Sequence, residues 1–256
     1  MVIAVVNNKG GVGKTTTSVN LAAALAGPRR KVLLVDLDSQ ASASLWLGVD
    51  RPRLKPSSAS CLLQAFPVPK AVRTTGVPHL DLVTGSVELA SADLALVDVP
   101  GRELTLKHVL QRIRERYDIV LLDCPPSLSL VTVNAMVAAD ALIVPVTPQH
   151  LAVEGLVSFL SATEKVRSRL APRGRLLGIL LTMVETARSA GVELREGLRA
   201  QYRHDVFYTE IMASHCLADA PAAGKSIFQH APRSRAASAF RRLSAEVLER
   251  LRRPRH

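Results

Sequence analysis

Short apolar runs recur along this chain and alternate with longer stretches in which apolar residues return at helical spacing. The runs predict buried strands, and the stretches between them predict amphipathic helices. Strands are expected at residues 2–6, 31–36, 79–83, 117–123, 141–146 and 176–182, and helices at 15–26, 102–117, 152–170 and 234–252. Residues 50–60, with Pro52 and Pro56, are expected to form an exposed loop. This alternation is typical of a doubly wound, mostly parallel α/β sheet flanked by helices.

Length and composition fit one such domain. With 256 residues and 48% apolar content, we expect a single domain over residues 1–256, without an N-terminal helix-turn-helix extension. The first strand is expected to begin at Val2, so no signal peptide is expected, and no apolar run reaches the ~18 residues of a membrane span. Cys61, Cys124 and Cys216 have irregular spacing, which favours buried thiols in a reducing cytosol over metal or cluster ligation.

The first apolar run leads into the clearest chemical signal. Residues 7–16 read N-N-K-G-G-V-G-K-T-T, which fits the P-loop pattern G-x-x-x-x-G-K-[ST] with Asn8 in place of the first glycine. A second lysine, Lys9, stands at the start of the loop, as in the deviant Walker A pattern K-G-G-x-G-K-[ST]. A glycine-rich turn between a strand and a helix directs backbone N–H groups at phosphate oxygens. The alternative, a glycine turn with an incidental lysine, does not explain why every position is filled.

The loop residues have separate expected roles. Gly10, Gly11 and Gly13 allow positive φ and close approach of the backbone to phosphate. Lys14 is expected to contact the β- and γ-phosphates, and the Thr15 hydroxyl to ligate Mg²⁺. The expected nucleotide-binding set is Lys9, Gly10, Gly11, Val12, Gly13, Lys14, Thr15 and Thr16. ATP and Mg²⁺ are therefore the expected cofactors.

Carboxylates follow two further apolar runs. Asp36 and Asp38 end the run that begins at Lys31, and Asp123 ends the run that begins at Tyr117, in the manner of a Walker B strand. Because ligands bind at the carboxyl ends of parallel strands, these side chains are expected near the P-loop. Thr15, Asp36 and Asp123 are the predicted metal-site residues. A carboxylate that only caps its strand is the alternative for Asp123.

Further motifs extend the pattern over nearly the whole chain. They are V-D-L-D-S-Q at 35–40, D-C-P-P-S-L at 123–128, N-A and A-D within 134–140, D-A-P-A-A-G-K at 219–225 and R-S-R-A-A at 233–237. In this order they resemble the motifs of the ParA/Soj-type partition ATPases, relatives of MinD and the nitrogenase iron protein. Residues 211–217 depart from the family's I-P-R-N-x-x-L, which leaves the base contacts of Met212–Cys216 open.

The resemblance implies catalytic roles for three residues: Lys9, Lys14 and Asp38. Lys9 would reach across a nucleotide sandwich dimer to the partner's phosphates, like an arginine finger supplied in trans. A solvent-facing lysine is the alternative. Asp38 would position the attacking water, and Lys14 would offset phosphate charge. Slow ATP hydrolysis, weak without DNA and a partner, is the expected activity.

Positive charge is concentrated in the C-terminal part of the chain. Of a net charge of +11, residues 160–256 supply +9, with 18 Lys/Arg against 9 Asp/Glu. A basic face of this kind is typical of a phosphate-backbone binder, although a solubilising surface is the alternative. The candidate DNA-binding residues are Arg188, Arg195, Arg199, Arg203, Arg233, Arg235, Arg241 and Arg242. Aromatic content of 4% argues against base stacking, so duplex DNA without sequence preference is expected.

Together with the charge distribution, the resemblance implies an ATP-dependent homodimeric switch that binds DNA, is stimulated by a ParB-like partner, and segregates or positions origins or plasmids. It would be cytoplasmic and nucleoid-associated. A MinD-like membrane-surface ATPase is one alternative, but no Trp or Phe follows Phe240, so no stable membrane association is expected. An ATPase that positions a protein cargo on the nucleoid is another, and it shares the same chemistry.

Overall fold

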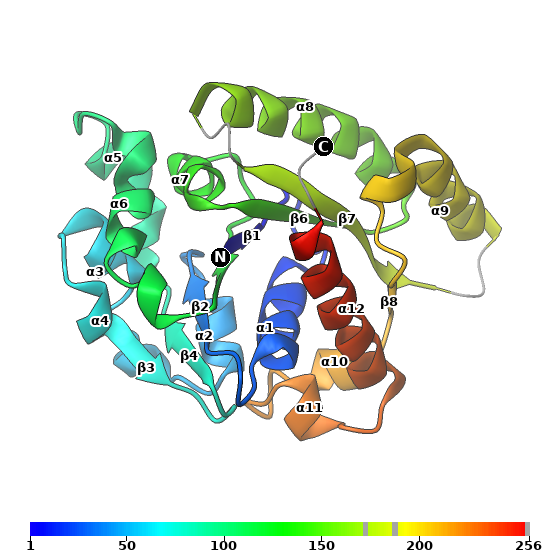
Figure 1. The fold of residues 1–256 in the computed structure, drawn as a ribbon, viewed down its shortest axis with the longest axis horizontal. Coiled ribbons are helices and arrows are strands. Elements are labelled where there is room, and N and C mark those ends of the chain that lie inside the picture. The colour runs from blue at the N-terminus through cyan, green and yellow to red at the C-terminus, as the bar shows by residue number, and fades with distance from the viewer. Residues whose placement is uncertain (171–173, 186–188, 254–256) are drawn as a thin grey trace.

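An eight-stranded sheet runs through the centre of the protein (Figure 1). The computed structural model describes residues 1–170, 174–185 and 189–253. The strand order is β3-β4-β2-β5-β1-β6-β7-β8, and neighbouring strands pair in parallel except for β3 and β4. The strands are β1 (Val2–Val5), β2 (Val32–Asp36), β3 (Val72–Thr74), β4 (Leu80–Val83), β5 (Ile119–Asp123), β6 (Ala141–Val146), β7 (Arg175–Val184) and β8 (Ile211–Met212). The predicted mostly parallel α/β sheet is thus confirmed.

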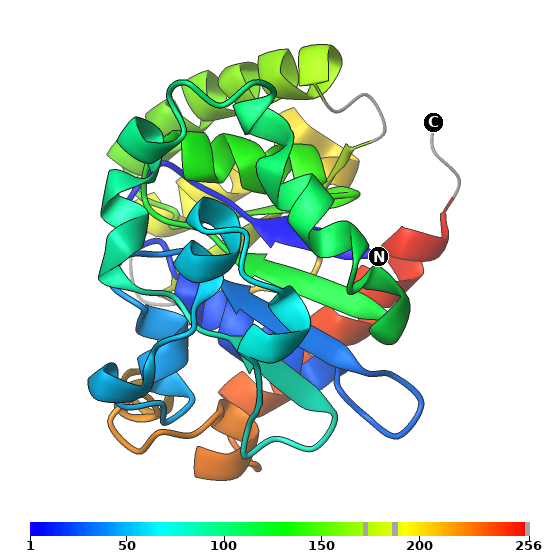
Figure 2. The same ribbon diagram turned by 90° about the vertical axis from the view of Figure 1, so that its left-hand side faces the viewer.

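Helices cover both faces of the sheet, as Figures 1 and 2 show. One face carries α1 (Lys14–Leu25), α2 (Ser42–Trp46), α10 (His215–Asp219), α11 (Ile227–His230) and α12 (Arg235–Arg252). The other carries α3 (Ser58–Leu63), α4 (Val68–Ala71), α5 (Ala92–Ala95), α6 (Thr105–Gln111), α7 (Leu130–Ala138), α8 (His150–Leu170) and α9 (Ser189–Tyr202). Strand β1 serves both layers, since Ile3 and Val5 enter the first core while Val2 and Ala4 enter the second.

The central strands explain why apolar runs predicted them so well. Every residue of β1, β2, β5 and β6 is buried, because helices on both faces leave no solvent-facing side. The edge strands β3 and β8 were not predicted. Each is short, and β3 is partly exposed, so neither forms a continuous apolar run. Apolar periodicity therefore identified the interior of the sheet but not its edges.

The helix expected at 102–117 was wrong in its extent. The structure has α6 between two 3₁₀ turns, Arg102–Leu104 and Arg114–Arg116. Ile113 leaves the helical conformation with φ −124° and is fully buried. Burial of this side chain in the core thus accompanies the end of the helix. The loop expected at 50–60 ends early, because Ser57 caps α3 by accepting a hydrogen bond from Ser60 N.

Candidate functional site

The P-loop connects β1 to α1 at the carboxyl edge of the sheet. Gly11 and Gly13 have φ of +72° and +78°, values that L side chains rarely adopt, whereas Gly10 does not have the positive φ that was expected of it. Gly13 is the N-cap of α1 and has no side chain to bind the first-turn amides. Asn7 fixes the start of the loop, because its Nδ2 donates to Pro145 O at 2.7 Å and its Oδ1 accepts from Lys9 N at 2.9 Å. The loop conformation therefore suits an anion in front of α1.

Lys14 lies inside this loop rather than in solvent. It is the first residue of α1, only 7% exposed, and its Nζ donates to Lys9 O at 2.6 Å. Desolvation by burial lowers the pKa of its ammonium group. A partly buried cation held across the loop by a carbonyl oxygen is well placed to exchange that contact for a phosphate oxygen.

Asp123 is fully buried at the end of β5 and holds the first turn of α1. Its carboxylate accepts hydrogen bonds from Thr15 Oγ1 at 2.9 Å and from Ser18 Oγ at 2.8 Å. Burial, and then the charge of Asp36, raise the pKa of Asp123. The sequence motifs predicted Thr15 and Asp123 in one metal site but not the direct hydrogen bond between them, and they did not indicate Ser18. The available signal was that Ser18 lies three residues after Thr15, on the same side of the helix.

Asp36 lies beside Asp123, since the two residues are Cα partners on the adjacent strands β2 and β5. Its buried carboxylate accepts from Ser44 N at 2.9 Å, Ser44 Oγ at 2.7 Å and Asp38 N at 3.1 Å. Burial raises the pKa of this carboxyl group despite these hydrogen bonds. Asp36 therefore organises the loop after β2, a task that the sequence did not reveal.

Asp38 differs from both buried carboxylates. It is half-buried just past the end of β2, and its Oδ1 accepts from Gln40 N at 3.0 Å. Gly85, which follows β4, lies against this loop, and its backbone N donates to Ser44 Oγ at 3.0 Å. No motif indicated Gly85, although a glycine two residues after a predicted strand was a possible signal.

Replacing Gly85 with alanine should destabilise the fold. An added Cβ would lie 2.6 Å from Asp38 O and 2.8 Å from Asp36 Oδ1, so the loop would have to shift. We expect a loss of about 1–3 kcal/mol in the free energy of unfolding, which urea denaturation measures. Gly27→Ala is the matched control, because an added Cβ there has no atom within 4 Å. Equal midpoints for the two variants would contradict the close approach.

Lys9 is half-buried, and its side chain lies against α8. A Cβ built on Gly155 would be 2.8 Å from Lys9 Cε and 3.3 Å from Lys9 Nζ. The absence of a side chain at Gly155 therefore gives Lys9 its space. A role of Lys9 in a partner's site stays a prediction.

A groove of about 880 Å³ opens at the carboxyl ends of β7 and β8. It lies beside the P-loop, because Thr182 of β7 donates from Oγ1 to Val12 O at 2.9 Å and Gly13 packs against the same side chain. The groove is lined by Val184, Glu185, Met212, Ala213, Ser214, Cys216, Arg233, Ser234, Arg235, Ala236, Ser238, Ala239 and Arg242. It thus includes the segment that departs from the family pattern.

The structure divides the candidate DNA-binding arginines into two groups. Arg233, Arg235, Arg241 and Arg242 are exposed in or just before α12, and all but Arg241 line the groove. Arg195 and Arg199 of α9 both pair with Glu210, at 3.3 and 2.7 Å. Arg203 is exposed at the end of α9, and Arg188 lies outside the described residues. Helices α9 and α12 cover opposite faces of the sheet (Figure 1), so these arginines come from two different layers.

Other C-terminal arginines are structural. Arg250 is 8% exposed, donates to the carbonyl oxygens of Leu177, His204 and Val206, and pairs with Glu246 at 2.9 Å. Its guanidinium lies 4.2 Å from the centre of the Phe207 ring. The charge count therefore overstated the positive charge available to a ligand.

The oxygen atoms at this edge fit Mg²⁺ held jointly with phosphates. Thr15 and Asp123 provide hard oxygen donors, the kind that Mg²⁺ prefers. Among the described residues, no group of three or more His, Cys, Asp or Glu side chains could hold a metal ion alone. Mg²⁺ keeps several water ligands and takes others from substrate phosphates, so a complete protein cage is not needed. Of the cysteines, Cys61 and Cys124 are buried as expected, whereas Cys216 is partly exposed in the groove.

Comparison with known proteins places this site in a family. The AAA domain family matches residues 1–174. The chain is 45% identical over 254 residues to the chromosome-partitioning ATPase Soj of Thermus thermophilus, covering 97% of this chain and 96% of the relative. It is 38% identical over 246 residues to the sporulation initiation inhibitor protein Soj of Bacillus subtilis, covering 96% and 97%.

A solved structure shows the same likeness in three dimensions. Cobyrinic acid a,c-diamide synthase from Mycobacterium smegmatis, with a bound ATP analogue and magnesium, superposes with a TM-score of 0.86 and 31% identity. The match covers 99% of this chain and 96% of that one. From its P-loop geometry and its similarity to the Soj proteins over almost their full length, this chain belongs to the ParA/Soj family of P-loop ATPases.

Proposed function

We propose that this protein is an ATP-dependent dimerising switch that binds duplex DNA without sequence preference and hydrolyses ATP to segregate or position chromosomal origins or plasmids. The observation that carries the proposal is the P-loop itself, with Lys14 buried across it and Thr15 bonded to Asp123. A second lysine, Lys9, lies in the same loop. In a nucleotide sandwich dimer, a residue at this position would contact the phosphates bound by the partner protomer. The Soj relative from Thermus thermophilus carries the name of a chromosome-partitioning ATPase.

The residues divide the work of ATP hydrolysis. The loop amides and Lys14 bind and orient the phosphates, and Asp123 holds the Thr15 hydroxyl in place through its hydrogen bond. Asp36 fixes the loop that carries Asp38, and Asp38 orients the attacking water in line with the γ-phosphate. Bound Mg²⁺ supplies neutralisation of phosphate charge. The groove beside the loop takes the nucleoside, with Met212–Cys216 along one wall.

DNA binding is assigned first to the exposed arginines at the start of α12. Two protomers joined by ATP would present two such basic surfaces, and the second contact would strengthen the first by avidity. Hydrolysis, stimulated by a ParB-like DNA-bound partner, would separate the protomers and release DNA. The protein would act in the cytoplasm on the nucleoid.

Reversing the charge of Arg233 and Arg235 should weaken DNA binding without removing ATP binding. For Arg233→Glu/Arg235→Glu we expect affinity for a random-sequence duplex to fall at least about tenfold. The slope of the logarithm of the binding constant against the logarithm of the salt concentration should become shallower, by the amount that about two phosphate contacts contribute. Binding is measured with ATP, ADP or no nucleotide across a salt series. Arg51→Glu/Arg53→Glu is the matched control, since both arginines are exposed at the same spacing.

The groove position of these arginines makes a second measurement necessary. If the affinity of the Arg233→Glu/Arg235→Glu variant for a fluorescent ATP analogue falls as much as its affinity for DNA, the arginines bind the nucleotide instead. Unchanged DNA binding would contradict their assignment to DNA directly.

The membrane alternative finds little support in α12. Its residues Leu243 and Val247 are fully buried against the sheet and are not available to a lipid surface. No helix in the described ranges is long and apolar enough to cross a bilayer. Anionic liposomes belong beside DNA in the binding experiment, because binding to liposomes alone would favour a MinD-like role. Positioning of a protein cargo would give the same DNA result and needs a cargo to be found.

A further inference from the structure

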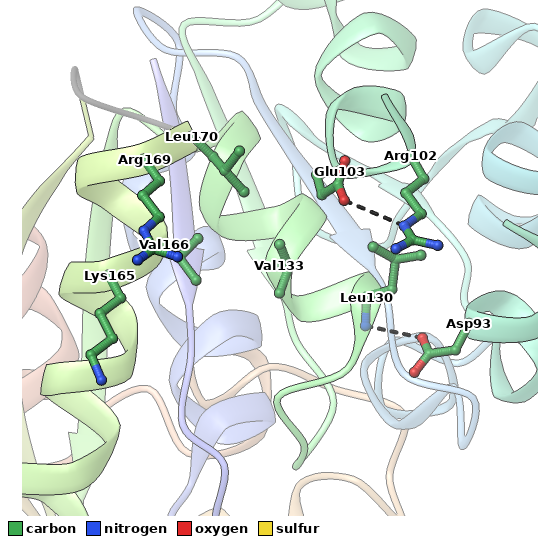
Figure 3. A pocket seen from close by; sticks show the side chains of 9 residues that line it. All are labelled: Asp93, Arg102, Glu103, Leu130, Val133, Lys165, Val166, Arg169 and Leu170. Carbon is green, nitrogen blue, oxygen red and sulfur yellow. Dashed lines mark hydrogen bonds and ion pairs between the residues drawn. The ribbon is translucent and has the colours of Figure 1, made fainter. Parts of the chain in front are cut away.

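A second groove, of about 630 Å³, lies on the face of the sheet covered by α7 and α8, opposite the face that carries α1 (Figure 3). Helix α7 forms its floor with Leu130 and Val133, and α8 forms one wall with Lys165, Val166, Arg169 and Leu170. The opposite wall comes from Asp93 of α5 and from Arg102 and Glu103 in the following 3₁₀ turn. An apolar strip thus runs between two charged walls.

The charges of the two walls are not balanced. On the far wall, Glu103 pairs with Arg102 at 3.3 Å, and Asp93 Oδ1 accepts from Leu130 N at 3.0 Å. On α8, Lys165 and Arg169 are exposed one helical turn apart, and neither side chain has a hydrogen bond or ion pair with the described part of the chain. The groove therefore presents uncompensated positive charge along one side of an apolar floor.

We propose that this groove docks an acidic amphipathic segment of a partner protein. Carboxylates of the segment would pair with Lys165 and Arg169, and its apolar side chains would cover Val133 and Val166. Lysine and arginine at this spacing match acidic residues one turn apart on a helix. Four of the lining residues, Asp93, Lys165, Arg169 and Leu170, are exposed, so the groove is too shallow to enclose a small molecule.

The opposite wall argues against DNA as the occupant. A duplex laid along Lys165 and Arg169 would bring its phosphates toward the carboxylates of Asp93 and Glu103. Phosphates also gain nothing from the apolar floor. A peptide can place negative charge on one side only, and this matches the asymmetry of the groove.

The groove is connected to the catalytic loops through Asp93. Ser129, the N-cap of α7, makes no side-chain capping bond, and Asp93 supplies the bond to Leu130 N instead. Asp93 also lines a smaller cavity of about 120 Å³ together with Ser39, Pro125 and Ser127, which follow Asp38 and Asp123. A segment in the groove therefore lies one side chain away from both loops, and its effect on hydrolysis rests on the proposed function.

The binding test uses two fluorescein-labelled helical peptides of the same leucine pattern, one with glutamates and one with lysines at the flanking positions. Fluorescence anisotropy should show binding of the glutamate peptide only. Lys165→Glu/Arg169→Glu should weaken it at least about tenfold, because like charges then face each other. The matched control, Arg112→Glu/Arg116→Glu, reverses two exposed arginines with the same spacing outside the groove and should bind as the wild type. Leu170→Gln removes an apolar side chain from the α8 wall without burying a charge and should also weaken binding of the glutamate peptide.

Equal binding of both peptides, or binding that survives the Lys165→Glu/Arg169→Glu change, would overturn the proposal. Displacement of the glutamate peptide by a 20-base-pair duplex from the wild type but not from the Arg233→Glu/Arg235→Glu variant would assign the signal to the DNA surface instead. The connection is tested by ATP turnover: the peptide should change it in the wild type and not in Asp93→Ala. If the wild type hydrolyses no ATP, the proposed function fails. The anisotropy experiment still tests whether the groove binds the glutamate peptide.

Discussion

Replacing Lys14 with alanine should abolish tight ATP binding and reduce hydrolysis by at least about 10²–10³-fold. The ammonium group is buried in the loop and bonded to Lys9 O, so its position is fixed before a nucleotide arrives. No other lysine of the P-loop can replace it, because Lys9 points toward Gly155 of α8. Titration with a fluorescent ATP analogue measures binding, and phosphate release measures turnover.

The Lys14→Ala result needs two controls. Lys14 is buried, so urea denaturation must show that the variant still folds, and Lys14→Gln keeps most of the side-chain volume. Lys70→Ala removes an exposed lysine far along the chain and should behave as the wild type. ATP binding at wild-type affinity by a folded Lys14→Ala protein would refute the central role of this residue.

Local motifs predicted the parts of the site that a short segment builds by itself. The P-loop was predictable because its glycines, lysine and threonine act within one strand–turn–helix unit, and both Gly11 and Gly13 have the expected positive φ. Asp36 and Asp123 were predictable because each ends an apolar run, and parallel pairing then makes them neighbours. In both cases backbone topology turns a sequence pattern directly into position.

Contacts between distant segments were not predictable in this way. Gly85 meets Asp36, Asp38 and Ser44 only after β2 and β4 have paired, and no spacing along the chain indicates this contact. Glu210 likewise pairs with Arg195 and Arg199 across the turn that follows α9. Such contacts decide which charges stay available to a ligand. A charge count over 160–256 cannot separate a structural arginine from one that is free to bind DNA.

Asp38→Ala should leave ATP binding intact and stall hydrolysis, by about 10²–10⁴-fold if the carboxylate acts on the attacking water. Asp38 differs from the two other carboxylates of the site in its burial and in its hydrogen bonds. Asp36 and Asp123 are fully buried and hold Ser44, Thr15 and Ser18, so replacing either would disturb the loop or the helix. Asp38 is half-buried and its carboxylate accepts one backbone hydrogen bond, from Gln40 N, so its removal costs the fold little.

A stalled Asp38→Ala protein should accumulate in the ATP state, and that makes the variant a test of the whole switch. With ATP, light scattering should show a persistent dimer, and DNA binding should last as long as the nucleotide does. Asp50→Ala, which removes an exposed carboxylate from another loop, is the control for both measurements. Normal hydrolysis by Asp38→Ala would assign water positioning to another group. Stalled hydrolysis in a protein that stays monomeric would keep the catalytic role of Asp38 and remove the dimer from the mechanism, because the ATP state alone would then not join two protomers.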